Sequence, residues 1–364
     1  MPSLFGPSFQ TTSSDLAYYL TGAKLAYLRA LAGNNKQLFP KFAYVPSIGG
    51  PSSAGQIMTD TVMREDGTMG KAMRYRFPIV IGYDRWKVWK PGDTRPKSGP
   101  GFVEFDATLE RLVTDSKEVY FYEFDRDPYG IIRAHIPIMM SRALTLWDQR
   151  VAAALVANAT NKIDSLPFFS PDSAAHPYNP LKPGLGGQGN DLAVTAIDVP
   201  NVRNNISKLS SVIGPDGQPL DTAGEVKIMF LMPNRDLNIQ MKQALQSAIV
   251  AQSVGVAGAG VSNPLLGEAE TMLYQYLLGT EDQPVFGGNK QPRDRVFYAL
   301  AVPAGDDRPI AVLPGEQPRP YITGVDPNSA LNDTEGKVRF GADAFGAAVT
   351  TVWQRAIRCV LNPV

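Results

Sequence analysis

The 364-residue sequence lacks the side chains on which many enzyme classes depend. Its one cysteine, Cys359, excludes an intrachain disulfide and a cysteine-rich zinc site. It has two histidines, His135 and His176, and no His-Glu-x-x-His pattern, so the common zinc hydrolase arrangement has no support. No run of 18 apolar residues is present, and we expect no membrane-spanning helix. The first residues lack a basic segment followed by an apolar run, so we expect no signal peptide.

Sequence signatures of cofactor binding and catalysis are missing as well. The two glycine-rich stretches, GLGGQGN at 184–190 and GVAGAG at 255–260, match neither a phosphate-binding P-loop nor a dinucleotide fingerprint. No Gly-x-Ser-x-Gly elbow is present. We therefore assign no catalytic residue, no metal ligand and no cofactor.

The chain also has no net charge, because 35 basic residues balance 35 acidic ones. A dedicated nucleic-acid-binding protein would carry a basic excess, so this class is disfavoured. Charged residues make up 19% of the chain, below the usual level of about 25%. With 33 glycines and 30 prolines, such a chain is expected to contain much loop and to bury surface against partners.

Hydrophobic periodicity in the first half predicts a long β-hairpin followed by a long helix. Apolar residues alternate over 72–90, with Pro78 indicating an edge strand or a bulge, and strand character resumes over 102–124. Within 131–157, apolar residues recur at steps of three and four, which predicts a helix with a packed face.

The second half predicts an α/β or α+β lobe at about 190–325. A buried strand is expected at 225–232, and Pro233-Asn234 is expected to cap a helix that runs to about Gln252. Residues 337–361 return to strand character and are expected to rejoin the earlier sheet. The fold class is therefore α+β.

Charge is strongly segregated in the hairpin region. Residues 71–100 carry eight basic residues, and residues 104–127 carry eight acidic ones. The two blocks can pair within one subunit or between copies, where opposite charges would set the register. A solvated hairpin without specific contacts, or phosphate binding by the basic block, remain alternatives. The candidate contact residues are basic Arg74, Arg76, Arg85, Lys87 and Lys90, acidic Glu104, Asp106, Glu110, Glu118 and Glu123, and the apolar anchors Trp86 and Trp89.

The order of these elements resembles the tailed-phage major capsid proteins with the Hong Kong 97-type fold, and more narrowly the Mu-like major head subunit (gpT-like) family. The similar segments are LPFFSPDSAAHPYNP at 166–180, DGQPL at 216–220, NPLLG at 263–267 and the ending VRFGADAFGAAVTTVWQRAI at 338–357. The sequence departs from the pattern in the long Pro/Gly-rich insert at 91–101 and at Thr350-Thr351, where relatives often carry glycine.

The resemblance implies an organisation and a function. The segments would be an N-terminal arm (1–50), an extended β-hairpin loop (51–105), a peripheral domain (106–185) with a spine helix (127–160), an axial domain (186–325) and a C-terminal return to the peripheral domain (326–364). Copies would assemble as pentamers and hexamers into an icosahedral virion capsid around double-stranded DNA, in the host cytoplasm. Decoration, scaffold and portal proteins would be further partners.

Two alternatives stay open. The chain could form an encapsulin-like shell that encloses an enzyme instead of DNA. It could also be a soluble enzyme with its site in the 190–325 lobe.

Overall fold

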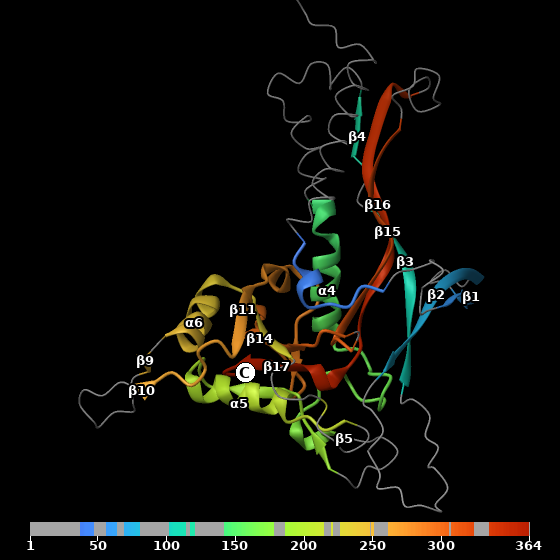
Figure 1. Ribbon diagram of the computed structural model, residues 1–364. Helices are drawn as coiled ribbons and strands as arrows, with labels where there is room; N and C mark the ends of the chain where they lie inside the picture. The colour runs from blue at the N-terminus through green and yellow to red at the C-terminus, as the bar shows by residue number, and fades with distance from the viewer. Residues whose placement is uncertain are drawn as a thin grey trace, which may run out of the picture. The chain divides into compact units, whose positions relative to one another are not determined.

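The computed structural model describes residues 37–46, 56–63, 69–80, 102–113, 117–120, 142–177, 186–214, 220, 226–247, 249–250, 261–305, 307–323 and 335–363 (Figure 1). The chain forms two compact units. Unit 1 comprises residues 1–37, 109–147 and 314–346, and unit 2 comprises residues 38–108, 148–313 and 347–364.

Unit 2 contains a five-stranded sheet with the order β11-β8-β14-β17-β7 (Figure 1). The central strand β14 (Val296–Val302) is antiparallel to β8 (Lys227–Met232) and to β17 (Ala356–Leu361). The outer strands β11 (Ala269–Leu273) and β7 (Asp191–Val194) run parallel to their neighbours. Every residue of β14 is buried, as expected for an apolar strand that is covered on both faces.

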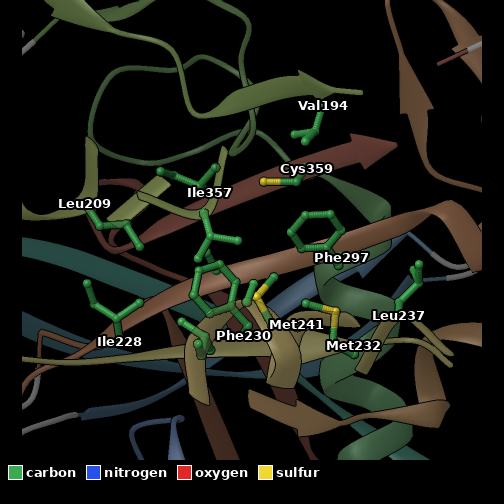
Figure 2. Packing of buried hydrophobic residues seen from close by; sticks show 14 of the residues in the cluster. Val194, Leu209, Ile228, Phe230, Met232, Leu237, Met241, Phe297, Ile357 and Cys359 are labelled. Carbon is green, nitrogen blue, oxygen red and sulfur yellow. The ribbon is translucent and has the colours of Figure 1, made fainter. Parts of the chain in front are cut away.

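Helices α5 (Val199–Ser210) and α6 (Arg235–Gln246) pack on one face of this sheet. Each helix begins at a side-chain cap, because the side chains of Asp198 and Asn234 accept hydrogen bonds from the backbone N–H groups three positions on. Figure 2 shows the resulting core, to which both helices and the alternate residues of the central strands contribute. Its larger members include Phe230, Met232, Leu237, Met241, Phe297 and Ile357.

The opposite face of the sheet contacts the segment that runs from helix α4 (Leu146–Ala157) to His176. The ring of Phe169 lies 5.4 Å from that of Tyr298 in β14, and the hydroxyl of Tyr274 donates to the backbone carbonyl of Asp148 at 2.8 Å. Helix α4 ends three residues before the predicted end of the spine helix. Asn158 has a φ of 49°, and this left-handed conformation terminates the helix. The first part of the predicted spine helix, 127–141, lies outside the described residues.

Short elements complete the described fold. The strand pairs are β5 (His176–Pro177) with β6 (Gly187–Gln188), β9 (Ile249–Val250) with β10 (Val261–Ser262), and β12 (Val285–Phe286) with β13 (Asn289–Lys290). The 3-10 helices are η1 (Phe39–Lys41), η2 (Asp172–Ala174), η4 (Gln275–Gly279), η5 (Arg293–Arg295) and η6 (Trp353–Arg355).

A second sheet has the strand order β1-β2-β3-β16-β15, with β4 paired to β16. In unit 2, β1 (Gln56–Met63) pairs antiparallel with β2 (Met69–Val80), and β2 also neighbours β3 (Phe102–Val113). Of the two features that Pro78 predicts, an edge strand or a bulge, the first does not hold for β2 as a whole, because β2 lies between β1 and β3. The described pairing with β1 ends at Arg76, so the proline lies beyond it.

In unit 1, the end of β3 and strand β4 (Lys117–Tyr120) both pair antiparallel with β16 (Lys337–Thr350), which neighbours β15 (Ile310–Thr323). Tyr321 lies across Gly341, where a Cβ would come within 2.6 Å of the phenol oxygen. A glycine at this position therefore lets the aromatic ring cover the backbone of the adjacent strand.

Two further expectations about the second half need correction. Residues 337–350 rejoin the earlier sheet as predicted, but residues 356–361 do not. They form β17 inside the five-stranded sheet, because residues 356–360 are buried on both faces and suit an inner strand. The helix capped by Asn234 ends at Gln246 and not near Gln252, and β9 follows at Ile249.

Candidate inter-subunit surface

Strands β2 and β3 separate apolar from charged side chains by simple alternation. Tyr75, Phe77 and Phe105 are at most 2% exposed. Their rings stack in sequence, with centroids 5.9 Å apart from Tyr75 to Phe77 and 6.1 Å from Phe77 to Phe105. The alternate residues, among them Arg74, Arg76, Glu104 and Asp106, lie on the other face. This charged face is the candidate contact surface that the sequence predicts.

The two blocks of opposite charge meet within the chain on this face. Arg74 lies 3.7 Å from Asp106, and Arg76 lies 3.6 Å from Glu104. The side chains of both arginines are more than 40% exposed. Such pairs contribute at most about 1 kcal/mol each, since water screens them. They are compatible with the intrachain alternative and leave the arginines accessible to a partner.

Lys162 is a third cation on this surface, and the sequence analysis missed it. Its ammonium group donates to Asp106 at 2.9 Å. This hydrogen bond, together with the charges of Lys162, Arg74 and Arg76, outweighs the effect of burial and lowers the pKa of Asp106. Asp106 therefore stays ionised well into the acid range. We call Arg74, Arg76, Glu104, Asp106 and Lys162 the β2–β3 ion cluster.

In unit 1, the acidic candidate Glu118 is also paired within the chain. Arg339 of β16 donates to it from two nitrogens, and Lys337 lies 3.8 Å from it. The hydrogen bond from Arg339 is the main reason why the pKa of Glu118 is lowered. Glu110 is exposed on β3, opposite Gly346 in the register of β16.

The remaining predicted contact residues lie outside the described residues. They are Arg85, Trp86, Lys87, Trp89, Lys90 and Glu123. Their contribution to a subunit contact stays a prediction.

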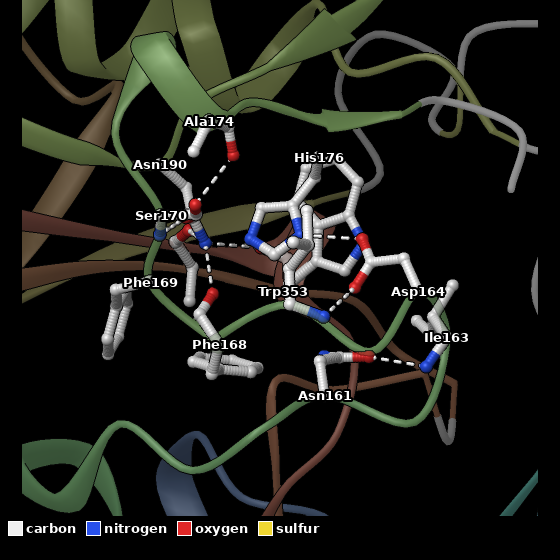
Figure 3. A network of polar contacts seen from close by, with 12 residues as sticks. Asn161, Ile163, Asp164, Phe168, Phe169, Ser170, Ala174, His176, Asn190 and Trp353 are labelled. Atoms are coloured by element: carbon white, nitrogen blue, oxygen red, sulfur yellow. Dashed lines mark hydrogen bonds and ion pairs between the residues drawn. The ribbon is translucent and has the colours of Figure 1, made fainter. Parts of the chain in front are cut away.

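A buried polar cluster in unit 2 is the second candidate, because it contains a carboxylate–histidine pair (Figure 3). Asp164 contacts Nδ1 of His176 at 2.6 Å, and the imidazole stacks on Trp353 with centroids 4.3 Å apart. Asn190 ties the same region together, because its side chain donates to the carbonyls of Phe168, Trp353 and Ala356. Several residues of this cluster belong to the HPYNP-containing and WQR-containing segments that carry the family resemblance.

This cluster has the geometry of a structural core and not of a catalytic site. His176 has no exposed surface and Asp164 only 2%, so a substrate cannot reach the pair. Among the described residues, Nε2 of His176 has no hydrogen-bond partner, and hence no nucleophile is bonded to it. Loss of any one polar group would leave the others buried and unpaired, which favours a single packing arrangement.

A buried ion pair lies in the same unit. Arg358 of β17 donates from Nε and Nη2 to the two carboxylate oxygens of Asp191 in β7, at 2.9 and 2.6 Å. Nη2 also donates to the carbonyl of Val285 at 2.7 Å, which attaches the β12–β13 hairpin to the sheet. Arg358 thus holds together a central strand, an edge strand and a hairpin.

The described residues contain no cluster of three or more His, Cys, Asp or Glu side chains that could hold a metal ion. None of the described helices is both long and apolar enough to cross a membrane.

Comparisons with known proteins give a match at the level of structure. No protein-family model matches the chain, and no curated protein matches it. The capsid structure of the cyanophage P-SCSP1u matches with a TM-score of 0.50 and 12% identity, over 87% of this chain and 92% of that one. The capsid of an empty GTA particle matches with a TM-score of 0.48, 12% identity and 89% of both chains. The mature capsid of bacteriophage PhiM1 matches with a TM-score of 0.47, 9% identity, and 87% and 92% of the two chains.

The cyanophage match extends over most of both chains, so it concerns the whole architecture and not one lobe. An identity of 12% carries no conclusion about function on its own. The predicted α+β class and Hong Kong 97-type fold are confirmed, while the narrower Mu-like resemblance stays a prediction. The chain has the fold of the tailed-phage capsid proteins.

Proposed function

We propose that this chain is the major capsid protein of a tailed phage. Its copies assemble as pentamers and hexamers into an icosahedral shell that encloses double-stranded DNA, and the virion capsid is its location. The observation that carries the proposal is the structural similarity to the cyanophage capsid over 87% of this chain.

The segments implied by the resemblance become part of this proposal. The antiparallel pair β1 and β2 belongs to the extended loop, the five-stranded sheet forms most of the axial domain, and β4 and β16 belong to the peripheral domain. Strand β17 is the exception, because it lies in the five-stranded sheet and not with the peripheral strands.

The contact between subunits is assigned to the extended loop. Arg85, Lys87 and Lys90, with Trp86 and Trp89 as apolar anchors, would lie on a neighbouring copy and face its acidic residues. Arg74 and Arg76 already pair with Asp106 and Glu104 in their own chain. A role for these two arginines between subunits requires an exchange of partners, which the exposure of both arginine side chains permits.

The first test is negative-stain electron microscopy of the purified chain expressed alone. Closed shells, or rings of five and six copies, are the expected result. Scaffold and decoration proteins are further partners in this proposal, so the chain is also co-expressed with its neighbouring genes. Only small globular particles under both conditions, together with a tightly bound small molecule, would overturn the proposal in favour of the enzyme.

The second test addresses the contact. The double variant Arg85→Glu/Lys87→Glu is expected to lose assembly while its circular dichroism and unfolding midpoint stay unchanged. The matched control is Arg203→Glu/Lys242→Glu, which reverses the same charge on exposed faces of α5 and α6. Normal shells from the first variant would refute the contact assignment but not the capsid function. Nuclease-protected DNA in the shells distinguishes a capsid from a compartment that encloses protein.

A further inference from the structure

Residues 38–46 form a strap that is packed onto the rest of unit 2. Phe39, Phe42 and Ala43 are at most 3% exposed, and the ring of Phe42 meets that of Tyr274 edge-on at 5.5 Å. Tyr44 makes two backbone hydrogen bonds to β15, both at 2.8 Å. Its N–H donates to the carbonyl of Ile310, and its carbonyl accepts from the N–H of Val312. The second half of the strap is thus held by several independent contacts.

In the first half of the strap, the N–H groups of Leu38 and Phe39 depend on one carboxylate. Helix η1 begins at Leu38 without a side-chain cap of its own. Asp148 of α4 supplies the missing acceptor from 109 residues away. Its Oδ1 accepts from the N–H of Phe39 at 2.8 Å and of Leu38 at 3.2 Å, and Oδ2 accepts from Leu38 at 3.1 Å. Because unpaired N–H groups at a helix start are costly to bury, Asp148 stabilises the docked turn.

Tyr274 links the same carboxylate to the five-stranded sheet. Its hydroxyl lies 3.2 Å from Oδ1 and 2.8 Å from the backbone carbonyl of Asp148, while its N–H donates to Met232 of β8 at 2.7 Å. Burial and the nearby carboxylate raise the pKa of Tyr274 well above its usual value, so the phenol keeps its proton and remains a donor. Asp148, Tyr274 and the N–H groups of Leu38 and Phe39 form one closed contact, which we call the Asp148 latch.

No charge compensates the carboxylate of Asp148 within the described residues, where the side chain is fully buried. The ionisable groups on the neighbouring elements are Lys41 on η1, Arg150 on α4, Tyr276 behind Tyr274, and Arg308, which donates to the carbonyls of Pro40 and Ala43. Burial outweighs the three hydrogen bonds and raises the pKa of Asp148. The carboxylate is therefore less favoured at this position than in water.

The geometry indicates where a proton can be accommodated. Oδ1 accepts from Phe39, Leu38 and Tyr274. Among the described residues, Oδ2 accepts only from the N–H of Leu38, which also donates to Oδ1. A proton on Oδ2 leaves all three contacts of Oδ1 in place. It removes the buried charge without breaking the latch.

We propose that the Asp148 latch is a proton-sensitive device that holds the strap 38–46 more firmly when Asp148 is protonated. In the open state Asp148 contacts water and ionises at its ordinary pKa of 3.8, which lies below the pKa in the closed state. A raised pKa in the closed state means that closure gains stability as the pH falls through that pKa, and loses it as the pH rises. Acid therefore tightens this contact, whereas acid weakens most carboxylate contacts. The proposal concerns the single subunit and does not depend on shell assembly.

Amide hydrogen exchange of the full chain tests the proposal. Protection factors of Leu38 and Phe39, corrected for the intrinsic rate at each pH and referred to the amides of β14, are expected to rise between pH 7 and pH 4. One pKa unit corresponds to about a tenfold change in the ratio of closed to open forms. In Asp148→Asn the protection is expected to be independent of pH, because the amide carries no charge but keeps an oxygen acceptor. The matched control Asp198→Asn changes an exposed carboxylate that also accepts from a backbone N–H, and should behave like the wild type.

Two results would overturn the proposal. One is wild-type protection that changes by less than about twofold over this range, where a rise of one pKa unit would give about a fourfold change. The other is the same pH dependence in Asp148→Asn. Should that variant not fold, Tyr274→Phe replaces it. The phenol donates to the Asp148 carboxylate and favours its ionisation, so its loss should move the midpoint of the pH-dependent protection to higher pH. An unchanged midpoint would contradict the latch.

Discussion

Replacing Arg358 by methionine is expected to destabilise unit 2 by about 3–5 kcal/mol, the cost of removing one partner from a buried ion pair. The guanidinium group is 1% exposed and the carboxylate of Asp191 is 4% exposed. Methionine keeps much of the volume, so the loss comes from charge and hydrogen bonds and less from a cavity. The variant leaves the Asp191 carboxylate buried without its two donors, and the carbonyl of Val285 without its donor.

Equilibrium unfolding in urea measures this cost, provided that the slope of free energy against urea stays the same. The double variant Asp191→Asn/Arg358→Met should be more stable than Arg358→Met alone, because it buries no unpaired charge. Arg358→Lys should lie between wild type and Arg358→Met, since lysine keeps the charge but not the two-pronged geometry. If Arg358→Met costs less than about 1 kcal/mol, as exposed pairs do, the ion pair is not buried in solution and the reasoning fails.

Three other substitutions test separate parts of the structure. Asp198→Ala removes the cap of α5 and should lower the unfolding free energy by about 1 kcal/mol in urea, with no change if the cap is not formed. Gly189→Ala should cost more than this, because the new Cβ would lie 2.3 Å from the backbone nitrogen of Asp172; a neutral effect would contradict the close approach. Lys162→Gln should raise the pKa of Asp106. A lowered pKa supplies stability above the ordinary value of 3.8 that is lost as the pH falls through the folded pKa. The unfolding free energy of the variant should therefore fall less steeply than that of the wild type as the pH drops below 3.8.

Local signals in the sequence predicted the elements of the five-stranded sheet well. The buried run at 225–232 became β8, and Pro233-Asn234 does cap the helix that follows. The run at 295–302 became β14. These predictions succeed because a cap or an apolar run acts within a few residues. The end of α6 was predicted too late, since no stop signal stands near Gln246 and tertiary contacts decide where the helix ends.

Long-range partners could not be predicted in the same way. Asp148 and Leu38 are 110 residues apart, and Lys162 and Asp106 are 56 apart. Periodicity indicates which face of an element is apolar, but it does not indicate which loop lies over that face. Strand β17 was assigned to the wrong sheet for a related reason, because strand character alone does not select a neighbour. Both kinds of contact depend on the packing of the whole unit.

The segregated charges of the hairpin carry a more general lesson about the sequence pattern. A basic strand followed by an acidic neighbour brings opposite charges onto one face of a sheet, as Arg74 with Asp106 and Arg76 with Glu104 demonstrate. Within a chain these pairs form without the loss of translational and rotational freedom that association between copies costs, about 4–15 kcal/mol. Intrachain pairing is therefore the default outcome of this pattern. Arg74 and Arg76 therefore make a weak case for a contact between subunits, since their described partners lie in their own chain, and the assembly test is placed on Arg85 and Lys87 instead.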